Sequence, residues 1–165
     1  MTRTEGQVLA DVLEKVRELS NKFIAPFKDL DLNKPLSIDG TKFNTAYWIV
    51  AHLVWAEHFI IIKGVAGENM NIDWLDDFCF GSNPDEIKNR PAYEIILAKL
   101  DEVHAKSIDI IRNLNDEELD AENHIGAAFG ASKSKRNLIM HAIRHEPMHI
   151  GQLSWILKTN GISYA

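Results

Sequence analysis

The spacing of apolar residues constrains the fold of this chain more than any other feature, because it repeats with the period of an α-helix in four long segments. No stretch alternates polar and apolar residues for long enough to demand a strand. The segments that predict long amphipathic helices are about 5–24, Asn44–Lys63, Pro91–Leu114, and a stretch from Ser132 or Ser134 to Asn160. They predict an all-α fold, a four-helix bundle, in which side chains on facing helices build any ligand or metal site.

Turn and capping residues place the ends of these helices. Gly64 and Gly67 end the second helix, and Pro91 is expected at the first helical position of the third. A short helical turn is expected at Asp116–Leu119, and Gly161 suits the left-handed cap that would follow the last helix.

Length and charge bound the class of protein. The chain has 165 residues, enough for a single domain over residues 1–165, and its 45% hydrophobic and 25% charged residues are typical of a soluble globular protein. A formal net charge of −6 disfavours a nucleic-acid partner or a hold on anionic lipid. Cys79 is the only cysteine, and the first residues lack the apolar core of a secretory signal, so we expect a cytoplasmic protein.

The most apolar run, AYWIVAHLVWAEHFIII, raises the question of a membrane span. It is interrupted by His52, Glu57 and His58, and its length of about 17 residues is the short limit for crossing a bilayer. We interpret it as a buried helix in a protein with no membrane partner.

Three histidines share one face of the last predicted helix. His141, His145 and His149 are spaced i, i+4, i+8, so at ~100° per residue they fall within an arc of ~80°. The same face carries Leu138 and Ile156, so the histidines lie in an apolar, inward-facing stripe. Single residues of this kind are often core histidines hydrogen-bonded to neighbours. For the triplet, the spacing favours His145 and His149 as two ligands that chelate one divalent ion.

A metal held by protein side chains needs a third ligand, and His52 is the best candidate. It shares a helix face with Trp48 and Trp55, so it is expected to point into the core. His58 lies about 240° round the helix from His52 and is expected at the surface or at an interface. Two further histidines lack supporting spacing and are not expected to be ligands: His104 and His124.

The sequence HEPMH, residues 145–149, matches the H-E-x-x-H pattern of zinc proteases. The residues after His149 contain no His, Asp or Glu to supply the downstream ligand of such a protease. No strand is predicted that would align an extended peptide substrate. Pro147 also removes a backbone N–H, frees the carbonyl of Ile143 and tends to kink the helix. We reject the peptidase interpretation and keep the two histidines as ligands.

Two blocks of the sequence resemble the DinB-like superfamily, also called the YfiT-like metalloenzymes. NLIMHAIRHEPMHIGQLSWILKTNG is similar to the family's last bundle helix, whose H-x-x-x-H-x-G-Q pattern is matched by His145, His149, Gly151 and Gln152. YWIVAHLVWAEHF is similar to the second-helix block, where one histidine at the position of His52 supplies the third ligand. The resemblance implies an up-down-down-up four-helix bundle, often dimeric, with a divalent metal, zinc or nickel, on a three-histidine face.

The resemblance also implies a class of activity, because the family includes S-transferases and isomerases that use low-molecular-weight thiols. We expect a homodimer that binds a small-molecule substrate and activates a thiol or water, as a metal-dependent transferase or hydrolase does. The alternatives are a bundle that binds a metal or a small ligand without catalysis, and a purely structural bundle without metal.

Several residues near the expected ligands have more than one interpretation. Glu146 is either a general base or a partner of the metal ligands, or it is a solvent-facing helix residue. Gln152 lies on the ligand face and is expected to orient a ligand or bound water, while His141 is expected to support the ligands or line a pocket. Three aromatic residues would line a pocket or belong to the core: Trp48, Trp55 and Trp155.

Overall fold

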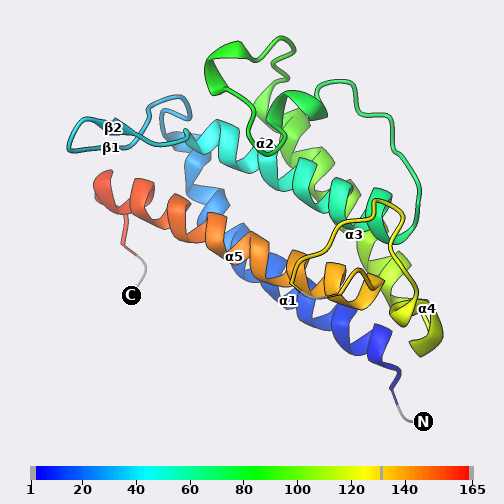
Figure 1. Ribbon diagram of the computed structural model, residues 1–165. Coiled ribbons are helices and arrows are strands. Elements are labelled where there is room, and N and C mark those ends of the chain that lie inside the picture. The colour runs from blue at the N-terminus through cyan, green and yellow to red at the C-terminus, as the bar shows by residue number, and fades with distance from the viewer. Residues whose placement is uncertain (1–2, 131, 164–165) are drawn as a thin grey trace.

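The computed structural model describes residues 3–130 and 132–163, and helices make up most of the regular structure in these ranges (Figure 1). The α-helices are α1 (Glu5–Ile24), α2 (Ala46–Glu57), α3 (Tyr93–Arg112), the short α4 (Asp116–Asp120) and α5 (Lys135–Thr159). The all-α prediction is confirmed. A two-stranded antiparallel hairpin, β1 (Ser37–Ile38) and β2 (Thr41–Lys42), lies between α1 and α2 and was not predicted.

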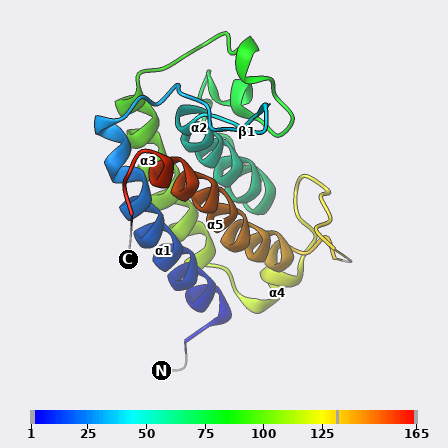
Figure 2. The ribbon, with the colours of Figure 1, turned by 90° about the vertical axis from the view of Figure 1, so that its left-hand side faces the viewer.

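The four long helices pack side by side. α1 packs against α3 and α5, and α2 packs against the same two helices. Figures 1 and 2 show α1 and α5 running in one direction along the molecule, while α2 and α3 run in the opposite direction. Because α2 and α5 are neighbours, the inward faces that carry the expected ligands meet.

Side-chain caps fix where the helices begin. Thr4 caps α1 and forms a capping box with Gln7, and Thr45 caps α2. Ser134 caps α5, which decides between the two serines that the sequence left open. The start of α3 was misplaced by two residues, because the helix begins at Tyr93 and Pro91 lies before it.

α2 continues without interruption into a π-helix, η2 (His58–Val65). Together Ala46–Val65 is long and apolar enough to cross a membrane by length and composition, but 83% of its most apolar window is buried inside the protein. This burial is typical of the central helix of a soluble protein, as the sequence indicated.

A glycine lets η2 approach α5 closely. A Cβ added at Gly64 would lie 2.4 Å from Cδ2 of Leu138 on α5, well inside van der Waals contact. The absence of a side chain at Gly64 therefore helps to set the spacing between the two helices that carry the histidines.

Candidate metal centre

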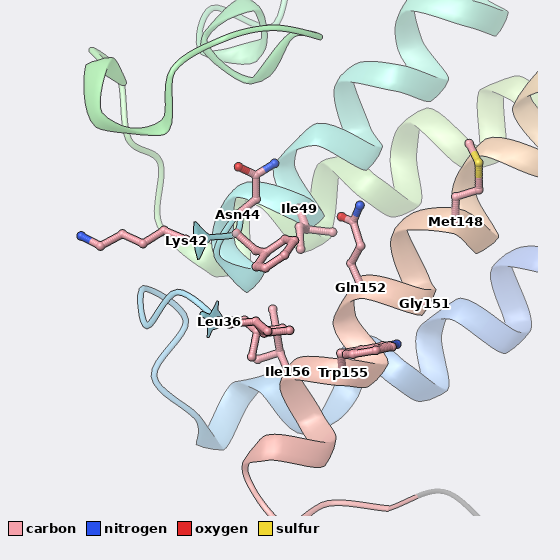
Figure 3. Close-up of a pocket in the computed structure, with 11 residues that line it drawn as sticks. Leu36, Lys42, Asn44, Ile49, Met148, Gly151, Gln152, Trp155 and Ile156 are labelled. Carbon is pink, nitrogen blue, oxygen red and sulfur yellow. The ribbon is translucent and has the colours of Figure 1, made fainter. Parts of the chain in front are cut away.

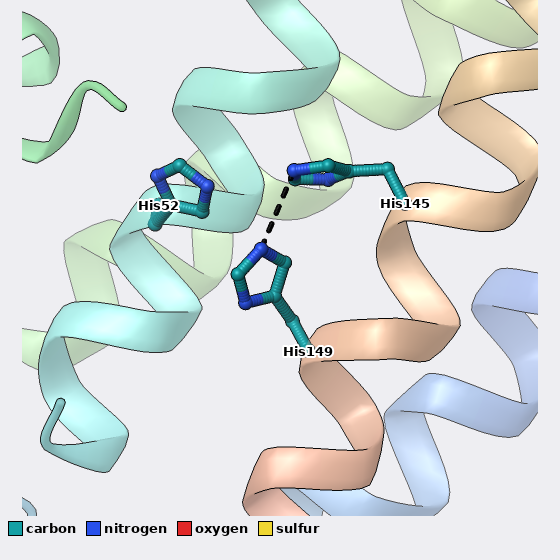
Figure 4. A group of neighbouring side chains, drawn as sticks. All are labelled: His52, His145 and His149. Atoms are coloured by element: carbon teal, nitrogen blue, oxygen red, sulfur yellow. Dashed lines mark hydrogen bonds between the residues drawn. The ribbon is translucent and has the colours of Figure 1, made fainter. Parts of the chain in front are cut away.

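The three histidines expected to be ligands converge in the space between α2 and α5 (Figure 4). His52 comes from α2 and is 1% exposed, while His145 and His149 come from successive turns of α5 and are half-buried. One ring nitrogen from each histidine lies within 4.8 Å of the others. The fold thus brings together residues that are almost one hundred positions apart in the chain.

Hydrogen bonds fix the orientation of two of these rings. Nδ1 of His52 lies 2.7 Å from the carbonyl oxygen of Phe78, and Nδ1 of His149 lies 3.1 Å from Oε1 of Gln152. Because both oxygens only accept, each Nδ1 carries the proton and donates it. Nε2 of each ring then keeps its lone pair. This arrangement, in which the far nitrogen is held by an oxygen, is the usual support of a metal-ligating histidine.

Burial keeps the three imidazoles neutral. It lowers the pKa of His52 to about 4, an effect that the hydrogen bond to Phe78 opposes and the nearby His149 reinforces. Burial and the neighbouring histidines lower the pKa of His145 to about 3, and burial also lowers the pKa of His149. At neutral pH the rings therefore present lone pairs, which are the form that a metal binds.

The distance between the two α5 ligands tests whether the cluster fits a metal. Nε2 of His145 and Nε2 of His149 are 3.3 Å apart. A tetrahedral zinc ion with bonds of about 2.0–2.1 Å separates neighbouring ligand nitrogens by about 3.3–3.4 Å. Three neutral imidazoles suit zinc or nickel and leave at least one coordination position for another molecule. The residues present fit a divalent ion.

Aromatic rings enclose His52. The indole of Trp48 stacks on it with ring centroids 4.6 Å apart and planes at 10°, and Trp55 lies against it at 5.4 Å. Trp155 behaves differently, because it is 62% exposed and so does not belong to the core. His141 stacks on Phe129, with centroids 3.6 Å apart, and lies beside the cluster instead of within it.

Glu146, inside HEPMH, is turned away from solvent. It is 5% exposed, so the solvent-facing interpretation is wrong. Its oxygens accept hydrogen bonds from Nε and Nη2 of Arg17, at 2.9 and 2.8 Å, because α1 covers this side of α5. No hydrogen bond joins Glu146 to the three ligand histidines within the described ranges. The structure thus gives this carboxylate an ion pair, and its role as a base remains a prediction.

The sequence analysis missed Arg17, which belongs to α1 and contacts each of the other three long helices. From α1 its guanidinium reaches Glu146 on α5, Oε2 of Glu57 on α2 at 2.7 Å, and the carbonyl of Leu100 on α3 at 3.0 Å. Oε1 of Glu57 also lies 2.9 Å from Nδ1 of His104. The periodicity of α1 contained the signal, because an arginine occupies its buried face. That face consists of Gly6, Ala10, Leu13, Arg17, Ser20 and Ile24.

His58 contradicts its predicted place at the surface. It is 2% exposed, and its Nε2 accepts a hydrogen bond of 3.1 Å from the backbone N–H of Met70. The prediction failed because the loop after η2 folds back over this side of the helix. His104 lies against Glu57 and His124 is exposed, so neither joins the cluster, in line with the sequence.

Comparison with known families agrees with this site. The family model of the DinB superfamily matches residues 10–153, a region that includes all three ligand histidines, so the chain belongs to the DinB superfamily. Members of this superfamily bind divalent metals, and this chain has a three-histidine cluster whose geometry can hold such an ion. No curated protein matches the chain significantly.

Proposed function

We propose that this protein is a metal-dependent enzyme in which His52, His145 and His149 hold a zinc or nickel ion. The observation that carries the proposal is the convergence of three neutral imidazoles, one buried and two half-buried, with the Nε2 atoms of His145 and His149 3.3 Å apart. Without a metal, the Nε2 atoms of His145 and His149 can share one proton in a hydrogen bond, and a divalent ion bound to all three rings would take the place of that proton.

The chemistry follows from the ligand set. A divalent ion bound there would supply Lewis acidity, which lowers the pKa of a thiol or water and yields a nucleophile near neutral pH. Phe78 and Gln152 hold the rings of His52 and His149 in place, and Trp48 shields His52 from solvent. The proposed reaction is S-transfer or hydrolysis on a small molecule, with a low-molecular-weight thiol as one partner.

The fold and surface complete the proposal. We propose that the four long helices form the up-down-down-up bundle of the DinB superfamily. We also propose that the protein forms a homodimer and is located in the cytoplasm. Nucleic acid and membrane are not proposed as partners, in keeping with a net charge of −6 and a buried apolar helix.

One observation favours a second candidate, a module that binds a metal or small ligand without catalysis. The acidic residue nearest in sequence to the ligands, Glu146, has both oxygens engaged by Arg17. A carboxylate held in this way is poorly placed to take a proton from a substrate.

Metal content is the decisive measurement. Elemental analysis of protein purified without an affinity tag is expected to give one equivalent of zinc or nickel, and His52→Ala and His149→Ala should each lose most of it. His124→Ala, which changes an exposed histidine outside the cluster, is the matched control. Wild-type protein that binds neither ion would refute the proposal.

Turnover separates the two candidates. Saturable S-transfer from a low-molecular-weight thiol to a small electrophile, lost in His149→Ala, would identify an enzyme. Stoichiometric metal without such turnover, or hydrolysis, across a panel of thiols and esters would favour the binding module.

A further inference from the structure

A cavity of about 720 Å³ lies beside the histidine cluster, between α5, the start of α2 and the β1–β2 hairpin (Figure 3). Gln152 is part of its wall, and the same side chain contacts Nδ1 of His149. The volume is in the range of small-molecule sites. Cavity and metal centre are therefore adjacent and share one side chain.

The lining of this cavity is largely apolar and unusually exposed. Trp155 is 62% exposed and Phe43 is 48% exposed, although large apolar side chains on a monomer surface are normally scattered. Ile49 forms part of the wall on the α2 side. An apolar or aromatic group that entered the cavity would remove these surfaces from water.

The polar groups of the lining include hydrogen-bond donors that are free for a ligand. Because Oε1 of Gln152 accepts from His149, the amide NH₂ keeps its donors for another molecule. Figure 3 shows Gln152 extending from α5 toward α2, and Asn44 lies just before the start of α2. The Asn44 amide has no hydrogen bond, and Lys42 has no ion pair, with the residues that the structure describes.

The charge of the lining indicates which ligand these donors suit. No acidic residue lines the cavity in the described part of the chain, although the whole chain carries 24 acidic and 18 basic residues. The cavity has Lys42 at its edge and amide donors on its wall. An anionic oxygen meets N–H donors and a nearby cationic side chain there, whereas a cation meets no negatively charged side chain.

We infer that this cavity binds a small molecule with an apolar or aromatic body and a terminal carboxylate, held by Gln152 and Asn44. That this molecule is the substrate rests on the proposed metal-dependent function, because the cavity delivers it to the space beside His149. Binding itself does not depend on that function.

The test uses 3-phenylpropionate as the probe and its uncharged amide as the comparison. Titration of the ¹⁵N-labelled full chain, with and without zinc, is followed by ¹H–¹⁵N NMR. We expect saturable shifts confined to the signals of Phe43, Asn44, Gln152 and the Trp155 indole, with weaker binding of the amide. No saturation in either form, or shifts that map elsewhere, would overturn the inference.

Two variants separate the roles of the body and the carboxylate. Trp155→Ala should weaken binding of both probes, while Leu19→Ala, an exposed apolar residue on the outer face of α1, should change neither. Gln152→Glu still offers His149 an acceptor but replaces the donors by a negative charge. It should weaken 3-phenylpropionate by at least about tenfold, as expected for a lost hydrogen bond to a charged group.

Zinc content measured on the same samples keeps the two proposals distinct. Probe binding to a chain that takes up neither zinc nor nickel would refute the metal centre and leave the cavity assignment standing. Zinc uptake without probe binding would refute the cavity assignment and leave the metal centre standing. The cavity assignment is also overturned if the Phe43 and Trp155 signals shift with protein concentration alone, because a second copy of the chain would then cover this face.

Discussion

At the scale of single residues, the side chains of HEPMH point to two different neighbouring helices. His145 and His149 face α2 and join His52, while Glu146 faces α1 and pairs with Arg17. Pro147 lies on the exposed side. In a zinc protease the glutamate of this pattern works on the same water that the metal holds, whereas here the carboxylate binds a buried arginine.

Removal of Arg17 is expected to destabilise the protein strongly. Burial alone would lower the pKa of Arg17, but Glu57 and Glu146 outweigh it and raise the pKa, so the guanidinium stays charged. Arg17→Met would leave two buried carboxylates without a counter-charge and should cost about 3–5 kcal/mol in the free energy of unfolding. Urea unfolding followed by circular dichroism measures this loss.

Two controls test whether the loss in Arg17→Met comes from the buried ion pairs: removal of an arginine at the surface, and removal of the carboxylates that Arg17 pairs with. Arg112→Met removes an arginine that pairs with Asp11 and Glu14 at the surface, and should cost no more than about 1 kcal/mol. Adding Glu57→Gln and Glu146→Gln to Arg17→Met should recover part of the loss, because no unpaired charge stays buried. Equal costs for Arg17→Met and Arg112→Met would contradict the assignment.

At the scale of elements, α5 contributes side chains to the histidine cluster, the buried ion pair and the cavity. Its inward face carries two histidines of the proposed metal centre, a neighbouring face carries Glu146, and Gln152 and Trp155 line the cavity. The helix runs unbroken from Lys135 to Thr159 although Pro147 lies inside it. Proline here removes one backbone hydrogen bond, but packing of the rest of the helix retains the helical path.

Pro147→Ala is expected to stabilise α5. The substitution restores an N–H that can donate to the carbonyl of Ile143, and position 147 is exposed, so no packing is lost. The gain should be about 1–2 kcal/mol, because the helical preference for alanine exceeds the entropy that proline removes from the unfolded chain. Metal content should not change, since both ligands already have metal-compatible spacing.

Thermal and urea unfolding measure this gain, with Met148→Ala as the neighbouring exposed control. Met148 is 57% exposed, so its change should stay within about 0.5 kcal/mol. A loss of stability in Pro147→Ala would contradict this prediction and would show that the local helix geometry at position 147 favours proline over alanine.

At the scale of the whole molecule, the buried histidines make stability depend on pH. The folded pKa values of His52 and His145, about 4 and about 3, lie below the value of about 6.5 for an unfolded histidine. Below pH ~6.5 the unfolded chain therefore binds protons that the folded chain does not. Above that pH the histidines should contribute their full stabilisation to the free energy of unfolding of the metal-free protein. This free energy should fall as the pH is lowered toward 4.

Urea unfolding between pH 7.5 and 5 checks this dependence while the carboxylates contribute little. Burial would raise the pKa of Glu57, but Arg17 and His104 lower it, so its contribution is lost only at more acidic pH. His145→Leu should flatten the profile, because one buried neutral imidazole is removed. A profile that is flat in the wild-type protein would contradict the neutral, buried state of the cluster.

The sequence by itself determined the long helices and the helix faces that carry His52, His145 and His149. These features are periodic within one helix, and a single helix repeats its geometry every 3.6 residues whatever surrounds it. The sequence also indicated the family, because the two blocks that resemble it contain His52 and the pattern at residues 145–152, and the match to the DinB superfamily confirms it.

Only the tertiary structure decided what lies opposite each face. The Phe78 carbonyl that orients His52, the Arg17 contacts, the burial of His58 and the cavity beside Gln152 join segments distant in the chain. Periodicity tells which way a side chain points, but not which partner it meets. That partner is set by how the segments pack, and for His52 and His58 it is a backbone group of the connection between η2 and α3, which no side-chain pattern reveals.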